Sequence, residues 1–224
     1  MGEKNLCCGM MRDRAALRRQ RIIDAARTLF VCNGFHATGV AQIAKASGVA
    51  VGQIYRDFAA KEDIVAAIVE GDCGRLLERE SLQRAILAGD TESVWHWIGQ
   101  FVRPTTGREA VVMLAEITAE STRNERIAAI FARTRADVWV NILAALALLM
   151  PGDRAAGRRE LLAELALTQS LGLRQQFLLQ PDMDVERLAD AIIAVIMREV
   201  EAVNAVTAAG PDTGIGGKTR APNR

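Results

Sequence analysis

Apolar residues recur with helical spacing along almost the whole chain, and this pattern predicts its elements. Ile22, Ala26, Leu29 and Phe30 share one face of a predicted helix from about Ala15 to Asn33. Strand-like alternation of useful length is absent from the sequence, and an apolar content of 50% with only 4% aromatic residues favours helices. We therefore expect an all-α fold.

Two short helices joined by a tight turn are predicted after the first helix. Thr38 offers an N-cap hydroxyl to the first of them, and Gly48 can adopt the positive φ that a sharp turn requires. Val49, Ile54 and Phe58 form the apolar stripe of the second helix, whose other face is polar. This pattern is typical of a helix-turn-helix, in which the second helix enters the major groove of DNA.

The same residues resemble the DNA-binding domain of the TetR/AcrR family of repressors. The resemblance is carried in one register by Arg21–Phe30, Gly34-Phe35, Thr38, Ile43-Ala44, Gly48-Val49, Gly52, Tyr55, Phe58 and Lys61-Glu62. It implies an N-terminal three-helix helix-turn-helix DNA-binding domain at 15–61, followed by a helical effector-binding and dimerisation domain at 62–208. Composition predicts a flexible arm at 1–14 and a disordered tail at 209–224.

The resemblance also implies which residues meet DNA. Thr38, Tyr55 and Lys61 match positions that contact phosphates, and Gln53 occupies a base-facing position from which it can bond adenine. The full set of expected DNA contacts is Thr38, Ala41, Lys45, Val51, Gly52, Gln53, Tyr55, Arg56, Lys61, Arg18 and Arg19. The chain departs from the family at three positions. The family usually has Ser or Thr where this chain has Gly39 and Ala50, and often has His where it has Asp57. Asp57 should repel a phosphate unless it accepts from cytosine or pairs with Arg56.

Charge is divided unevenly along the chain. Residues 1–61 have ten Lys and Arg against four Asp and Glu, a net charge of +6, so the remainder carries −5 of the overall +1. This asymmetry suits a nucleic-acid-binding module joined to a domain of another kind. Arginines crowd the first turns of the first helix, where they oppose the helix dipole, and we interpret them as attracted to phosphates.

Beyond the predicted DNA-binding domain the sequence predicts only helices. A longer helix opens at Lys61, and its Gly71 and Gly74 would mark either a bend or close packing. Prolines and glycines then delimit helices at about 91–102, 108–121, 125–149, 155–179 and 184–207. The last two have more apolar surface than one core needs. They could pack within the monomer, but we expect them to form half of a four-helix bundle with a second copy, as in the family. The expected dimer contacts are Leu162, Leu165, Leu173, Leu188, Ile192 and Ile196.

Large and polar side chains of the second domain are candidates for an effector pocket. They are Trp95, His96, Phe101, Met113, Glu116, Phe131, Trp139, Gln169, Gln176 and Phe177. Together they favour a small, mostly apolar effector of aromatic or amphipathic type. Glu116 would either recognise a cation or pair with an arginine such as Arg123.

These features predict a homodimeric, ligand-responsive repressor that binds a palindromic operator in double-stranded DNA. An activator, a ligand-independent regulator and a helical interaction scaffold stay open as alternatives. An enzyme is not expected, because His36 and His96 belong to no recognisable catalytic motif. The four cysteines have no metal-ligand spacing, so neither metal nor cofactor is expected. Since no apolar run reaches the ~18–20 residues of a membrane span, we expect no membrane contact and a cytoplasmic protein.

Overall fold

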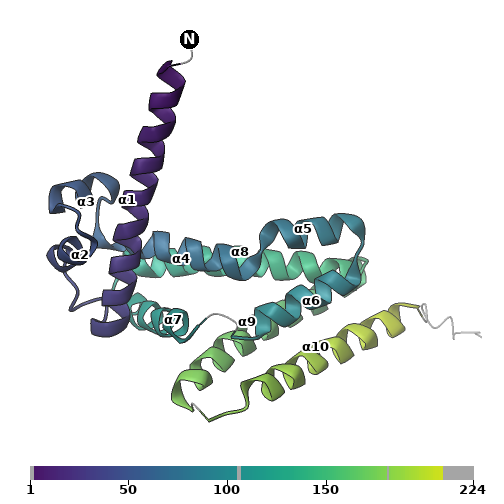
Figure 1. The fold of residues 1–224 in the computed structure, drawn as a ribbon. Coiled ribbons are helices and arrows are strands. Elements are labelled where there is room, and N and C mark those ends of the chain that lie inside the picture. The colour runs from purple at the N-terminus through teal and green to yellow at the C-terminus, as the bar shows by residue number, and fades with distance from the viewer. Residues whose placement is uncertain (1–2, 105–106, 181, 209–224) are drawn as a thin grey trace, which may run out of the picture.

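The computed structural model describes residues 3–104, 107–180 and 182–208, with side chains from Arg14 to Val206 within these ranges. Every regular element in these ranges is a helix, which confirms the all-α prediction (Figure 1). The elements are α1 (Glu3–Asn33), α2 (Val40–Ser47), α3 (Val51–Asp57), α4 (Lys61–Leu77), α5 (Arg79–Ala88), α6 (Thr91–Val102), α7 (Arg108–Ser121), α8 (Glu125–Leu149), the 3-10 turn η1 (Asp153–Ala155), α9 (Ala156–Leu179) and α10 (Val185–Ala208). No helix among the described residues is long and apolar enough to cross a membrane. The tail predicted at 209–224 lies outside the described residues.

The first helix begins at Glu3, whereas the sequence predicts a start near Ala15 and a flexible arm over 1–14. This segment has no proline and is rich in Met, Arg and other residues that favour helix, so α1 can extend through it. In Figure 1 the extension projects past α2 and α3, which pack beside the C-terminal half of α1. The structure therefore differs from the predicted arm.

The break between α4 and α5 falls at Glu78, not at the glycines of α4. Glu78 has a φ of +37°, a left-handed conformation that costs free energy for a residue with a side chain. Gly71 and Gly74 lie inside α4, and a Cβ on Gly74 would meet nothing within 4 Å. The sequence-based expectation of a bend or close packing at these glycines is thus wrong.

Two apolar clusters hold the molecule together. The larger one fills the body, which we define as α5–α10, and includes Leu146, Leu162 and Ile196. The second, which we call the head cluster, lies inside the head (α1–α3) and α4. It also contains Met113 and Ile117 of α7 together with two isoleucines of α8. The DNA-binding domain predicted at 15–61 therefore shares its core with the domain predicted at 62–208.

The loop between α1 and α2 is fixed from both sides. Thr38 is fully buried, and its hydroxyl donates to the carbonyls of Leu29 and Gly34 at 3.2 and 2.9 Å. It does not cap α2, because the N-cap is Gly39 and carries no side chain. From α4, the Lys61 Nζ donates to the carbonyls of Phe35 and Thr38 at 2.7 and 2.9 Å.

Lys61 therefore binds this loop through two hydrogen bonds. Its Nζ also lies 4.0 Å from the centroid of the Phe35 ring. Partial burial lowers the pKa of its ammonium group below the ordinary value. The structure gives Lys61 partners within the protein, in place of the phosphate contact that the family resemblance implies.

Replacing Lys61 by alanine should lower the free energy of unfolding by about 1–3 kcal/mol, because two carbonyls lose their charged donor. Lys45→Ala is the control, since Lys45 is exposed and should change that free energy by less than about 0.5 kcal/mol. Urea denaturation followed by circular dichroism measures both. Equal effects of the two substitutions would contradict the role of Lys61.

Candidate nucleic-acid interface and ligand cavity

The outer face of α3 presents the residues that the sequence predicts as base-facing. Ile54 is 1% exposed and points into the head cluster, so the opposite side of this short helix faces solvent. Val51 and Tyr55 are 41% and 53% exposed, and Gly52 is exposed beside them. Gln53 is half-buried. The side chain of Tyr55 is therefore largely exposed on this face.

The other predicted contacts separate into exposed and internal residues. Ala41 and Lys45 of α2 and Arg56 of α3 are exposed. Within the described residues neither Lys45 nor Arg56 takes part in an ion pair, and the Arg56 Nε only approaches the Gly52 carbonyl at 3.5 Å. Thr38 is buried, so its hydroxyl is not part of this surface.

The arginines of α1 bind the ends of the two short helices. The Arg19 guanidinium donates to the Asp57 carbonyl at 2.8 Å and lies 4.0 Å from the centroid of the Phe58 ring. Arg21 donates to the Ser47 carbonyl at 2.6 Å. Positive charge stabilises a helix C-terminus, where carbonyls lack partners. These arginines thus stabilise the head, whereas the sequence analysis attributes their cluster to phosphates.

Asp57 forms a two-bond ion pair with Arg18, at 2.7 and 2.8 Å, and not with Arg56. The Arg18 guanidinium lowers the pKa of the Asp57 carboxyl below its ordinary value. The acidic residue that departs from the family pattern is therefore neutralised from α1. This pairing explains how an acid is tolerated at the end of α3.

A small, partly open apolar cavity lies between α4 and the body helices α6, α7, α8 and α9. Its free volume is about 120 Å³. Three predicted ligand contacts line it, namely Phe101, Met113 and Phe131. Arg174, which is 4% exposed, and Ser170 are polar residues in the wall.

The remaining predicted ligand contacts lie elsewhere. Trp95 and Trp139 pack against the body core. Gln169 lines a depression on the outer face of α9 and α10. Gln176 is exposed, and Phe177 is half-buried on α9 away from the cavity. Glu116 accepts the backbone N–H of Phe35 at 3.3 Å, so it joins α7 to the head and does not line the cavity. Arg123 pairs with Glu120 instead. A helical stripe does not reveal which of its members face a void, and these predicted contacts do not line this cavity.

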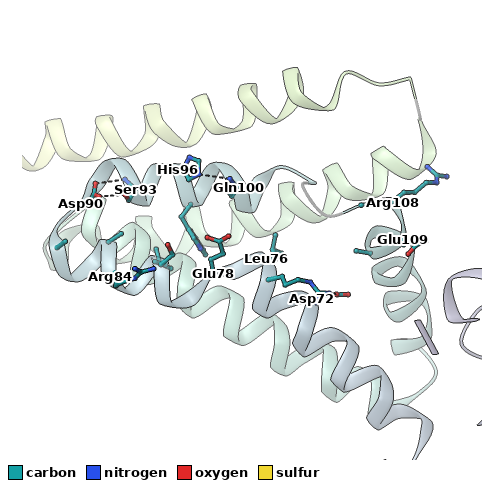
Figure 2. A pocket seen from close by; sticks show the side chains of 18 of the residues that line it. Asp72, Leu76, Glu78, Arg84, Asp90, Ser93, His96, Gln100, Arg108 and Glu109 are labelled. Carbon is teal, nitrogen blue, oxygen red and sulfur yellow. Dashed lines mark hydrogen bonds and ion pairs between the residues drawn. The ribbon is translucent and has the colours of Figure 1, made fainter. Parts of the chain in front are cut away.

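His96 lines a different space, an open groove between α4, α5, α6 and the start of α7 (Figure 2). The groove has a free volume of about 940 Å³, and its labelled residues are mostly polar or charged. His96 contacts Gln100 one turn along α6, with 3.1 Å between their Nε2 atoms. Asp72 and Leu76 line both the groove and the cavity, so they form part of the wall between them.

Arg174 and Ser170 are the site residues that sequence reasoning missed. The available signal was their spacing, since Leu167, Ser170 and Arg174 are three and four residues apart on one face of an apolar helix. An arginine at a position that periodicity marks as buried is expected to pair with an acidic group or another acceptor. Periodicity alone did not show that Arg174 borders a cavity.

Cavity and head share side chains. Met113 and Ile117 line the cavity and also belong to the head cluster. Asp72, another wall residue, pairs with Arg27 of α1 through two bonds of 2.6 and 2.8 Å. A molecule that fills the cavity would therefore press directly on side chains that support the head.

The outer face of α9 and α10 is apolar, but not through all of the predicted residues. Leu162, Leu173 and Ile196 are at most 3% exposed and pack in the body core, so the prediction of these three as an external contact is corrected. The exposed and half-exposed apolar side chains of this face are Leu161, Leu165, Leu188, Ile192 and Val195. We call this set the α9–α10 face.

The structure thus joins a helix-turn-helix head through α4 to a helical body with an apolar cavity, an architecture typical of DNA-binding regulators. Residues 22–68 match the family model described as bacterial regulatory proteins, tetR family. This match agrees with the resemblance to the TetR family that the sequence of the head shows.

Among its relatives, the HTH-type transcriptional regulator UidR of Escherichia coli K12 is 32% identical over 121 residues, 53% of this chain and 59% of UidR. The fatty acid metabolism regulator protein of Bacillus subtilis is 44% identical over 59 residues, 26% of this chain and 30% of that protein. The chain thus matches about three fifths of UidR and less than a third of the second relative.

Solved structures share the fold over most of the chain. Salmonella enterica GusR has a TM-score of 0.60 at 21% identity and covers 83% of this chain and 94% of its own. FadR of Bacillus subtilis, in complex with stearoyl-CoA, has a TM-score of 0.62 at 19% identity, with 79% and 96% covered. At these identities the likeness shows the fold alone.

The pairing of Arg18 with Asp57 predicts a pH-dependent contribution to stability. Because the folded pKa of Asp57 is lowered, the contribution exists above the ordinary carboxyl pKa and is lost as pH falls through the folded value. Asp57→Asn should lower Tm by roughly 2–4 °C at neutral pH, and the difference from wild type should vanish in acid. Asp24→Asn, at an exposed acid of α1, is the control. A difference that persists at a pH of about 2 would contradict the assignment.

Proposed function

We propose that the protein is a ligand-responsive transcriptional repressor that binds a palindromic operator as a homodimer and is released by a small, mostly apolar effector. The observation that carries the proposal is that Met113 and Ile117 belong to the cavity wall and to the head cluster at once. The relatives that share its head are transcriptional regulators, so no enzymatic role is proposed. As a DNA-bound regulator it would act in the cytoplasm.

The exposed face of α3 supports the DNA-binding part of the proposal. Val51 and Gln53 would meet base edges in the major groove, since Val can contact a thymine methyl and Gln can bond adenine. Ala41 would approach from α2, while Tyr55 and the cations Lys45 and Arg56 would contact phosphates. Arg18 and Arg19 would act indirectly, because both already bind Asp57.

Gly52 gives a specific reason to expect close contact between α3 and DNA. Glycine weakens a helix interior, yet a Cβ on Gly52 would meet nothing within 4 Å in the protein. No packing inside the chain therefore explains the glycine. A DNA backbone or base edge lying against α3 would explain it.

Gly52→Ala should therefore separate stability from DNA binding. The substitution should raise the free energy of unfolding by about 0.5–1 kcal/mol and weaken operator binding about tenfold or more. Binding is measured by fluorescence anisotropy at fixed salt, with the DNA upstream of the protein's own gene and a scrambled duplex. Gly74→Ala, another open helical glycine but far from α3, should stabilise the protein and leave DNA binding unchanged.

The proposal fails if the wild-type protein binds neither duplex at low salt, or binds both equally well. If Gly52→Ala binds the upstream DNA as tightly as wild type, then α3 does not read DNA at close range. The Gly74→Ala control shows whether any loss of binding follows from helix stabilisation in general.

The α9–α10 face supports the homodimer. Apolar side chains that stay exposed on two adjacent long helices mark an interaction surface, and two copies of such a pair can form a four-helix bundle. A twofold dimer would present two α3 helices to successive major grooves, ~34–36 Å apart, on a palindrome. Symmetry of the operator would then follow from symmetry of the protein.

Val195→Glu should convert the dimer to a monomer, because the new charge would be buried at the centre of the contact. Val195 is 42% exposed in the monomer, so the fold should tolerate the change. Leu87→Glu is the matched control, since Leu87 is 88% exposed on α5, outside the α9–α10 face. Sedimentation velocity at micromolar concentration measures both, and a dimeric Val195→Glu variant would contradict the assignment.

Release from DNA would follow from the shared wall. A ligand that enlarges the cavity would displace α7, which also bonds the α1–α2 loop through Glu116 and Phe35. The Arg27–Asp72 pair gives a second link, between α1 and α4. If the ligand binds better to a state in which the heads have the wrong separation, a coupling of about 1–3 kcal/mol changes DNA affinity about 5–150-fold.

A further inference from the structure

Arg174 of α9 is a buried cation without an acidic partner. Its side chain is 4% exposed, yet no ion pair reaches it anywhere in the described part of the chain. Burial lowers the pKa of its guanidinium to about 10. Buried charges in proteins are paired as a rule, because removing a charge from water is costly.

The hydrogen bonds of Arg174 run only to neutral oxygens. One terminal nitrogen donates to the Ser170 carbonyl and hydroxyl, and the other to the carbonyls of Phe101 and Arg103 at 3.0 and 3.2 Å. Phe101 and Arg103 lie at the end of α6, where the helix dipole offers about half a negative charge. That dipole compensates only part of the guanidinium charge. The Nε–H has no acceptor among the residues that the structure describes.

Other charged residues in the cavity wall are already neutralised. Asp72 pairs with Arg27 and Arg75, and Arg135 pairs with Glu164. Among the described wall residues, Arg174 is therefore the charged one without an oppositely charged partner. It borders a largely apolar space that Phe101 and Phe131 also line. A cavity of this kind is complementary to a molecule with one negative group and an apolar remainder.

We propose that the cavity binds an amphipathic organic anion, typically a carboxylic acid, whose acidic group pairs with Arg174 and whose apolar part lies against Phe101, Met113 and Phe131. This inference rests on the ligand site of the proposed function and specifies the chemistry of its ligand. A guanidinium holds a carboxylate through two parallel bonds, so the pairing would also orient the ligand.

The space around Arg174 fits a ligand larger than the cavity alone. A second space of about 250 Å³ opens between α7 and α9 and shares five wall residues with the cavity, Arg174 among them. The exposed residues Thr118 and Gln175 border this second space. An apolar chain could therefore fill the inner cavity while the acidic group stays at Arg174, between the two spaces.

Matched acids and amides test the proposal on the full-length wild-type protein. Octanoate and octanamide, and phenylacetate and phenylacetamide, are compared by isothermal titration calorimetry at a pH of about 7.5, where the acids are ionised. Each acid should bind about tenfold or more tightly than its amide, because only the acid neutralises the guanidinium. Equal affinities of acid and amide, or no heat from any acid at millimolar concentration, would overturn the proposal.

Variants assign the preference to Arg174. Arg174→Gln should reduce the affinity for each acid to within about threefold of its amide, whereas Arg158→Gln, at an exposed arginine of α9 outside the cavity wall, should keep the preference. Arg174→Lys keeps the charge and should keep part of the preference, which guards against loss of fold in the glutamine variant. An acid preference that survives in a folded Arg174→Gln variant would overturn the assignment.

Failure of this inference and failure of the proposed function give different results. Release of the protein from DNA by a neutral apolar compound, with no preference for acids, would retain the repressor and reject the anion. Acid binding that depends on Arg174 but leaves DNA affinity unchanged would retain the anion site and reject its role in release.

Discussion

The apolar contact between α7 and the head is the interaction on which the rest of the structure depends. Met113 and Ile117 of α7, with Ile127 and Ile130 of α8, complete a core that the head and α4 begin. Burial of each such side chain contributes about 1.5–3 kcal/mol. Four of them together are comparable to the whole stability of a small domain, about 5–15 kcal/mol. The head is therefore held in shape by the same helix that walls the cavity.

Hydrogen bonds and an ion pair of basic residues add to the apolar contact in holding the head together. Several of the ten basic residues in 1–61 bind within the protein, since Arg18, Arg19 and Arg21 bind α2 and α3 and Lys61 binds the α1–α2 loop. The exposed cations left near α3 are few, Lys45 and Arg56 among them. DNA affinity would then depend on shape and on a small number of phosphate contacts, presented by a rigid surface.

The sequence predicted well what depends on local chemistry. Helices at 91–102, 108–121 and 125–149 have the predicted bounds, and the turn at Gly48 has the expected positive φ of 65°. It predicted poorly what depends on which face meets which neighbour. Ile196 belongs to the same apolar stripe of α10 as the exposed Leu188, but periodicity cannot say which side of a two-sided helix faces the chain's own core.

The prediction of the cavity wall was limited for the same reason. Three of ten predicted wall residues line it, because an aromatic residue on an apolar stripe can fill a core as easily as border a void. Thr38 likewise had the chemistry of an N-cap, but its hydroxyl donates to the carbonyls of Leu29 on α1 and of Gly34 just after it. Whether Arg174 has an acidic partner depends on how α9 packs against its neighbours, which the periodicity of the sequence does not encode.

The most direct test of the account is whether the head and α7 unfold as one unit. Hydrogen exchange followed by mass spectrometry in increasing urea reports the opening of α2, α3 and α7 separately. The shared core predicts that the three helices lose protection at the same urea concentration, and that Met113→Ala lowers this concentration for all of them. Loss of protection in α2 and α3 at lower urea, with α7 still protected, would contradict the account.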